Sequence, residues 1–194
     1  MNQRMANPQI GKSLKVILIG DGGAGKTSLV NRFIHKSFSS IYKTTIGVDI
    51  SPFNTITAKT KKTIRFVLWD MSGQTHFKRF RARFYSGTSG AIIVYDLTNA
   101  SSYRNVQAWV KECQDNIHKP VPMIILGNKA DLNELLIDHP RSDYPNIPFF
   151  QTSAKNGNNV DKAFFSLFES VVGEKLEKED LSVEKSTHIP YNKT

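Results

Sequence analysis

Cysteine is nearly absent from this chain of 194 residues, which has Cys113 as its one thiol. A single cysteine cannot form an internal disulfide, and no cluster of cysteine and histidine exists to bind zinc. The reducing cytoplasm is therefore the expected compartment. Cys113 falls among apolar residues at helical spacing, which favours a small core residue over a reactive thiol.

Long hydrophobic runs are also missing. The longest runs, 91–95 and 123–126, have the length of strands, so we expect no membrane-spanning segment. Residues 1–13 have no apolar core of a signal peptide, and Asn2 excludes the N-myristoylation pattern. The last residues, HIPYNKT, contain no cysteine for prenylation. We therefore expect no lipid anchor and at most a peripheral contact with membranes, made through partners.

Acidic side chains are scarce, since 26 Lys and Arg oppose 17 Asp and Glu and leave a formal charge of +9. Most of the excess lies in 59–83, where Asp70 is opposed by Lys59, Lys61, Lys62, Arg65, Lys78, Arg79, Arg81 and Arg83. This cluster indicates a solvated face, a docking surface for an acidic partner, or a weak, salt-sensitive contact with anionic membrane. Nucleic acid is not expected, because no nucleic-acid-binding module accompanies the charge.

Hydrophobic periodicity predicts one α/β domain at 14–173, between a polar arm at 1–13 and a polar tail at 174–194. Helices are expected at 28–36, 101–117 and 159–175. Strands are expected at 14–19, 46–56, 63–69, 91–95, 121–126 and 147–150. The short gap between the second and third strands predicts an antiparallel hairpin. The order predicts a doubly wound, mostly parallel six-stranded sheet with one antiparallel strand at an edge.

A glycine-rich loop lies between the first strand and the first helix and fits the pattern G-x-x-x-x-G-K-[ST] at 20–27. Such a loop turns backbone N–H groups toward phosphates at a helix N-terminus. Lys26 would place its charge on the β- and γ-phosphates and Thr27 its hydroxyl on Mg²⁺. The phosphate-binding residues predicted here are Asp21, Gly22, Gly23, Ala24, Gly25, Lys26, Thr27 and Ser28.

Two later loops indicate which base is bound. Asn128-Lys129-Ala130-Asp131 follows a strand, and the Asp131 carboxylate can accept hydrogen bonds from two guanine donors, N1–H and the 2-amino group. Ser153-Ala154-Lys155 follows another strand and would offer backbone donors to the guanine carbonyl. Guanine is therefore favoured over adenine, which presents no such pair of donors. An adenine-using P-loop enzyme is the alternative, and ATP would then protect it against thermal unfolding.

Residues suited to bind Mg²⁺ and a γ-phosphate follow the third predicted strand, and another, Thr45, precedes the second. Asp70 at its end can hold Mg²⁺ through water, and Gly73 can turn its N–H toward a γ-phosphate. Thr45 can add its hydroxyl to Mg²⁺ and so sense the γ-phosphate, while Gln74 can orient the attacking water. Lys26 and Gln74 are accordingly the catalytic candidates, and Thr27, Thr45 and Asp70 the metal candidates.

These motifs together resemble the Ras superfamily of small GTPases, and its Rab branch most closely. The matching strings are GDGGAGKT, TTIGVD, WDMSGQ, GAIIVYDLTN, NKAD and SAK, in that order. The resemblance implies a P-loop NTPase G domain that cycles between GTP-bound and GDP-bound states with Mg²⁺-dependent hydrolysis, as a monomeric switch in vesicle trafficking or signalling. It also implies that Phe38 packs on the purine and that Lys129 lines its other side. Effectors, exchange factors and activating proteins would bind through 38–50 and 71–85.

The chain departs from the usual Rab pattern around Gln74, where Met71, Ser72, Thr75 and His76 replace the usual neighbours. A GTP-holding scaffold with little intrinsic hydrolysis is therefore the alternative to a hydrolysing switch. A glycine at position 22 would leave room for an arginine supplied by an activating partner.

Two further departures concern the surface. Ile50 stands where Rab proteins usually have Phe, in a triad with Trp69 and Phe84 that reads effectors. The segment 132–147 is shorter than in the family and contains Pro140 and Pro145, so its usual helix is expected to be a loop.

Overall fold

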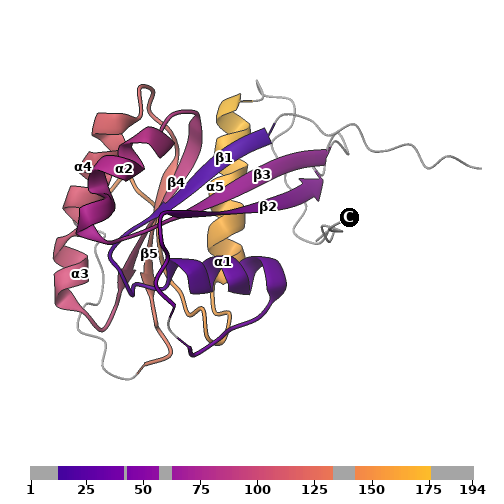
Figure 1. The fold of residues 1–194 in the computed structure, drawn as a ribbon. Helices are drawn as coiled ribbons and strands as arrows, with labels where there is room; N and C mark the ends of the chain where they lie inside the picture. Colours follow the sequence, from indigo (N-terminus) through magenta and orange to yellow (C-terminus); the bar gives the residue numbers. More distant parts are fainter. Residues whose placement is uncertain (1–12, 42, 57–62, 133–142, 176–194) are drawn as a thin grey trace, which may run out of the picture.

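A six-stranded sheet organises the residues that the computed structural model describes, which are 13–41, 43–56, 63–132 and 143–175 (Figure 1). The strands lie in the order β2-β3-β1-β4-β5-β6. β2 is antiparallel to β3, and the other neighbouring pairs of these strands are parallel. The doubly wound sheet with an antiparallel strand at its edge is therefore confirmed. Its strands are β1 Ser13–Ile19, β2 Val48–Ile56, β3 Thr63–Met71, β4 Thr88–Asp96, β5 Met123–Asn128 and β6 Phe149–Gln151.

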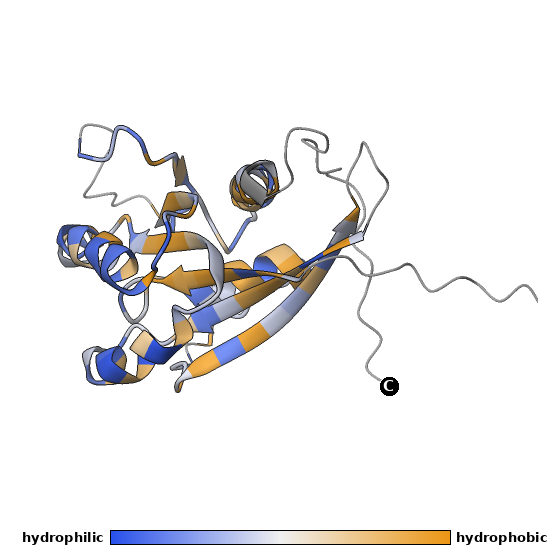
Figure 2. Cartoon of the chain, turned by 90° about the horizontal axis from the view of Figure 1, so that it is seen from above, coloured by the Kyte–Doolittle hydropathy of each residue, from blue (hydrophilic) through white to orange (hydrophobic). Residues whose placement is uncertain are grey.

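Helices bury both faces of this sheet, which is why its central strands are continuous apolar runs (Figure 2). On one face, α1 (Lys26–His35) and α5 (Val160–Lys175) pack on alternate residues of β1 and β4. Stacked rings reinforce this core, since the ring centroids of Phe33 and Phe164 lie 4.4 Å apart and those of Phe66 and Phe168 3.8 Å apart. On the other face, α4 (Val106–Asn116) packs on the remaining residues. This rigid frame holds the loops at the carboxyl ends of the strands.

The helix predicted at 101–117 is two helices, α3 (Ala100–Arg104) and α4, separated by Asn105. Asn99 caps α3, because its side chain accepts hydrogen bonds from the N–H groups of Ser101 and Ser102. The Asn105 side chain donates to Asp21 at 2.8 Å, a contact to a distant loop that apolar periodicity does not reveal. The single predicted helix was therefore wrong at this residue.

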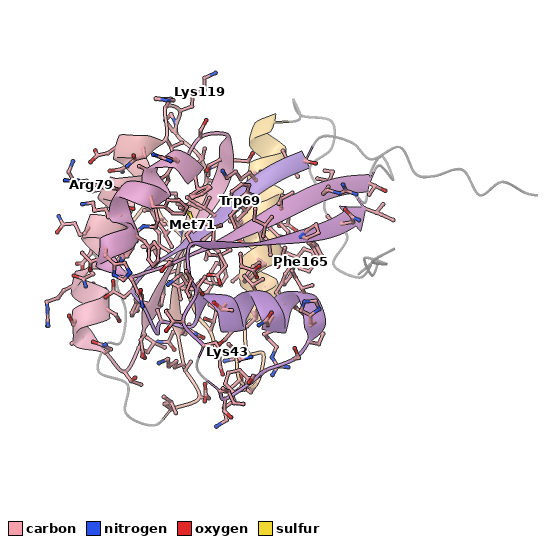
Figure 3. The ribbon with its side chains drawn as sticks, in the orientation of Figure 1. Lys43, Trp69, Met71, Arg79, Lys119 and Phe165 are labelled. Atoms are coloured by element: carbon pink, nitrogen blue, oxygen red, sulfur yellow. The ribbon has the colours of Figure 1, made fainter. Side chains whose placement is uncertain are left out.

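The basic cluster is not one solvated face. Its described members include Arg79, which lies at the outside of α2 (Lys78–Arg81; Figure 3), and Arg81, which is 2% exposed. Two short 3₁₀ turns flank α2, Thr75–Phe77 and Ala82–Phe84. Lys59, Lys61 and Lys62 lie outside the described residues, as do the arm at 1–12, most of the segment expected as a loop at 132–147, and most of the tail. Within the described ranges, no helix is long and apolar enough to cross a membrane.

Cys113 lies on the buried face of α4 with no exposed surface, which confirms it as a core residue. Burial raises the pKa of its thiol to about 12, so almost no thiolate exists at neutral pH. We expect Cys113 to react with a disulfide reagent at pH 8 at least about 100-fold more slowly in the folded protein than in urea. The reaction is followed by the absorbance of the thiolate that the reagent releases. Equal rates in the folded protein and in urea would contradict the burial of Cys113.

Candidate nucleotide-binding site

A cleft of about 580 Å³ opens where the loops after β1, β3, β5 and β6 meet. It brings together most of the residues predicted to bind nucleotide: Gly22, Gly23, Gly25, Lys26, Thr27, Ser28, Phe38, Thr45, Gly73, Gln74, Asn128, Lys129, Asp131, Ala154 and Lys155. The predicted residues that are not part of the lining each hydrogen-bond one that is: Asp21, Ala24, Asp70 and Ser153. The predicted site residues therefore gather around a single cleft.

Two glycines allow the loops of the cleft to approach closely. Gly25 has φ +94°, and a Cβ there would lie 2.2 Å from the Asn128 side-chain nitrogen. At Gly73 a Cβ would lie 2.2 Å from the carbonyl oxygen of Gly20. A side chain at Gly73 would force the two backbones apart, and a side chain at Gly25 would displace the Asn128 side chain. The glycine-rich loop is thus packed directly against the loop after β3 and against Asn128.

Lys26 lies at the floor of the cleft and is 5% exposed. Its Nζ donates hydrogen bonds to the carbonyls of Gly20 and Asp21, both at 2.8 Å, which fixes the ammonium inside its own loop. Burial lowers the pKa of Lys26 to about 8, against the opposing charges of Asp70 and Asp21. A buried cation in the first turn of a helix, beside a glycine-rich loop that lines the cleft, is suited to binding phosphate.

Three oxygen-bearing side chains meet beside Lys26. The hydroxyls of Thr27 and Thr45 lie 2.9 Å apart, and Thr27 donates a hydrogen bond to Oδ2 of Asp70. Asp70 is 1% exposed, and its Oδ1 is buried with no hydrogen-bond partner. Burial raises the pKa of Asp70 above its usual value, and the Thr27 hydrogen bond and Lys26 oppose that rise. An unsatisfied buried carboxylate oxygen beside two hydroxyls is a donor set that fits a hard divalent cation such as Mg²⁺.

Asn128 connects the loops rather than pointing freely into the cleft. Its side-chain nitrogen donates to the carbonyl of Ala24 at 2.9 Å, and its Oδ1 accepts the N–H of Ala154 at 3.1 Å. Asn128 is 2% exposed, so these hydrogen bonds form in a buried setting where losing one is costly. The end of β5 is therefore fastened to the glycine-rich loop on one side and to the loop after β6 on the other.

The Asp131 carboxylate faces the cleft in a fixed orientation. Its Oδ1 accepts the Ser153 hydroxyl at 2.5 Å, and the Lys155 ammonium lies 3.7 Å from Oδ2. Lys129, which also lines the cleft, forms an ion pair with Asp96 at 2.6 Å. Each of these two side chains is thus held by a partner on a neighbouring loop or strand end.

Sequence reasoning missed Arg32 of α1, which supports the loop after β6. Its Nε donates to the carbonyl of Ala154 at 2.7 Å and its Nη2 to that of Lys155 at 2.5 Å. An arginine at a polar position of a predicted helix gives no sequence signal for such a role. Asp96, the partner of Lys129, was also missed, because only the fold shows that the ends of β4 and β5 are neighbours.

The Ras family model matches residues 15–173 of this chain. The chain belongs to the Ras family. Rab-13 of Canis lupus familiaris is 40% identical to this GTPase over 165 residues, which cover 81% of the chain and 79% of that protein. Rab-13 of Bos taurus is 39% identical over 163 residues, with the same coverage. RABG3a of Arabidopsis thaliana is 36% identical over 181 residues, covering 86% of the chain and 85% of that protein.

The resemblance to Rab-like small GTPases is therefore confirmed. Members of this family bind GTP and GDP and hydrolyse GTP, so this protein is a GTP-binding switch with GTPase activity. The six-stranded fold agrees with the P-loop GTPase domain of the family.

Proposed function

We propose that this Rab-like GTPase binds Mg²⁺ and GTP in the cleft, with the phosphates on residues 21–28 and the guanine between Phe38 and Lys129. Asp131 accepts the two guanine donors, and the N–H groups of 153–155 face the guanine carbonyl. The contact that supports this proposal most strongly joins Thr27 to Thr45, because it brings Thr45 to the end of the glycine-rich loop beside Asp70.

Thr27 and Thr45 would hold Mg²⁺ through their hydroxyls, and Asp70 would hold it through water. The buried, unpartnered Oδ1 of Asp70 supports this assignment, since an orphaned carboxylate oxygen is costly unless it binds a cation or water. When bound, Mg²⁺ neutralises negative charge on the β- and γ-phosphates. Because Thr45 contacts both Thr27 and Asp70, loss of the γ-phosphate would release residues 38–47.

Lys26 and the loop N–H groups would stabilise the charge that develops on the transferring phosphoryl group. Gln74 lines the cleft, and its Cγ lies 4.0 Å from the position that a Cβ would take at Gly22. It would orient the attacking water from this place. Gly22 leaves space at the same spot for an arginine from an activating partner.

Replacing Gln74 with Leu is expected to slow hydrolysis of bound GTP by at least about tenfold, since the water loses its orienting group. The rate is measured as conversion of preloaded GTP to GDP in a single turnover. Gln107→Leu, at an exposed position of α4, is the matched control and should leave the rate unchanged. An unchanged rate for Gln74→Leu would favour a GTP-holding scaffold that hydrolyses little.

Partner proteins would bind across residues 38–50 and 71–85. Ile46, Ile50 and Phe80 are exposed there, at 82%, 49% and 43%. Ile50 lies opposite Trp69 in the β2–β3 ladder, and the rings of Trp69 and Phe84 are 5.7 Å apart, so the three residues of the predicted triad adjoin. An exposed apolar surface next to nucleotide-sensing loops suits recognition of the GTP-bound state.

We further propose that the protein acts in vesicle trafficking or signalling as a cytoplasmic monomer and reaches membranes through its partners. Its similarity to Rab-13 and RABG3a supports the trafficking role. The exposed cations Lys78, Arg79 and Arg83 border the apolar surface and would favour acidic partners.

A further inference from the structure

Arg81 is a buried arginine inside the segment that responds to nucleotide. It is the last residue of α2 and is 2% exposed, whereas Lys78 and Arg79 on the same short helix are exposed. A buried cation is retained only when partners compensate the loss of water. The partners of Arg81 therefore show what its charge does.

One side of the Arg81 guanidinium binds the backbone of the loop after β3. Its Nη1 donates to the carbonyl of Ser72 and to that of Gln74, both at 2.9 Å. These two carbonyls flank Gly73, whose Cα faces the glycine-rich loop at close range. Arg81 thus fixes the backbone on both sides of Gly73, and one of these two sides is Gln74.

The other side of the guanidinium is anchored to α4. Nε and Nη2 donate to the two carboxylate oxygens of Glu112, at 3.0 and 3.2 Å, and the Tyr85 hydroxyl donates to the same carboxylate at 2.8 Å. The Arg81 guanidinium also lies 4.5 Å from the centre of the Trp109 ring. Two-point pairing fixes the plane of the guanidinium, which a lysine could not reproduce.

The same helix also holds the glycine-rich loop. Trp109 donates its indole N–H to Oδ1 of Asp21 at 2.8 Å, and Asn105, just before α4, donates to Oδ2 of Asp21. The loop that contacts phosphate and the loop that carries Gln74 are therefore both fastened to α4. Their relative position is set by Asp21 on one side and Arg81 on the other.

We propose that Arg81 is a positioning residue for GTP hydrolysis: it holds the Ser72 and Gln74 carbonyls against α4 and so places Gln74 over the glycine-rich loop. This inference rests on the proposed role of Gln74. Arg81 does not touch the substrate and acts through the backbone of Gln74. Its removal therefore slows hydrolysis only while Gln74 is present to be positioned.

The test uses the paired replacement Arg81→Met with Glu112→Gln in the full chain. Removing both charges leaves no unpaired buried ion, and Gln at 112 keeps an acceptor for Tyr85. Hydrolysis of preloaded GTP is measured in a single turnover with and without Gln74→Leu, and release of fluorescent GDP is measured in parallel. Arg104→Met, at an exposed position ending α3, is the control.

We expect the paired replacement to slow hydrolysis by about tenfold when Gln74 is present and to add no slowing when Gln74 is Leu. GDP release should change by less than about twofold, since the groups facing the nucleotide are unaltered. Equal slowing in both backgrounds would show a general structural role, and an unchanged rate with Gln74 present would show no role at all. Either result overturns the proposal for Arg81 while leaving the effect of Gln74→Leu intact.

If Gln74→Leu alone leaves the rate unchanged, the proposed role of Gln74 fails and positioning by Arg81 fails with it. Should the paired variant unfold, as followed by circular dichroism, Arg81→Lys replaces it in the same comparison. Lysine keeps the positive charge beside Glu112 but cannot reach the carboxylate and both carbonyls with a rigid fork.

Discussion

Replacing Asp131 with Asn is expected to change the preference of this GTPase from GTP to XTP. The carboxylate accepts hydrogen bonds only, which suits the N1–H and 2-amino donors of guanine. An amide at this position can donate to the C2 carbonyl of xanthine and accept from its N1–H. Because a mispaired buried polar group is costly, the ratio of GTP to XTP affinity should fall by at least about 100-fold.

Competition of GTP and XTP against fluorescent GDP measures this ratio directly. Asp115→Asn is the matched control, since Asp115 is exposed on α4 and pairs with Lys111 away from the cleft. In the Asp131→Asn variant, the Ser153 hydroxyl can still donate to the side-chain amide oxygen, so the loop after β6 keeps its contact. Retained preference for GTP over XTP would show that Asp131 does not bind the base.

Replacing Lys26 with Met is expected to weaken binding of GDP and GTP by about 100-fold, because charge-assisted hydrogen bonds to phosphate are lost. The folded protein without nucleotide should not lose stability to the same extent. Burial already disfavours the Lys26 charge, as its pKa of about 8 shows, and methionine fills the same space without that desolvation cost.

Thermal unfolding with and without Mg²⁺ and GDP separates these two effects. The Lys26→Met variant should be stabilised less by nucleotide than the unaltered protein at the same nucleotide concentration, because a roughly 100-fold larger Kd lowers the stabilisation by about RT ln 100. Lys111→Met, at an exposed position of α4, should retain the stabilisation. Full stabilisation of Lys26→Met by nucleotide would contradict a phosphate-binding role for Lys26.

The fold and the motif residues could be predicted from the sequence because their signals are local. The strands predicted at 14–19 and 121–126 are short apolar runs, each followed by a loop of chemically distinctive residues, as at Lys26 and Asp131. Parallel strands place their carboxyl ends at one edge, so the loops that follow them meet without further information. The cleft lined by these residues follows from that geometry.

The supporting contacts could not be predicted, because each joins residues far apart in the chain. Arg32 reaches Ala154 across 122 positions, and Asp21 reaches Trp109 across 88. Arg81 belongs to a run of basic residues. It differs from Arg79 in the side of α2 on which it lies, since Arg79 is exposed and Arg81 is buried. Charge pattern alone therefore describes both as surface residues, although one is buried against Glu112.

The helix break at Asn105 has the same origin. Apolar spacing from 101 to 117 is continuous, and asparagine is tolerated within a helix at moderate cost. The Asn105 side chain bonds to Asp21, and the helix is interrupted there.

The most direct test of this account follows the nucleotide bound to purified protein that has been loaded with GTP and Mg²⁺ and freed of unbound nucleotide. Bound GTP and GDP are extracted and quantified over several hours. We expect bound GTP to be converted to GDP with first-order kinetics, and more slowly in the Gln74→Leu variant. Such conversion is what a switch needs if it is to turn off by its own hydrolysis. GTP that persists unchanged through the time course would contradict intrinsic hydrolysis; either the residues around Gln74 have then disabled it or an arginine from a partner is required.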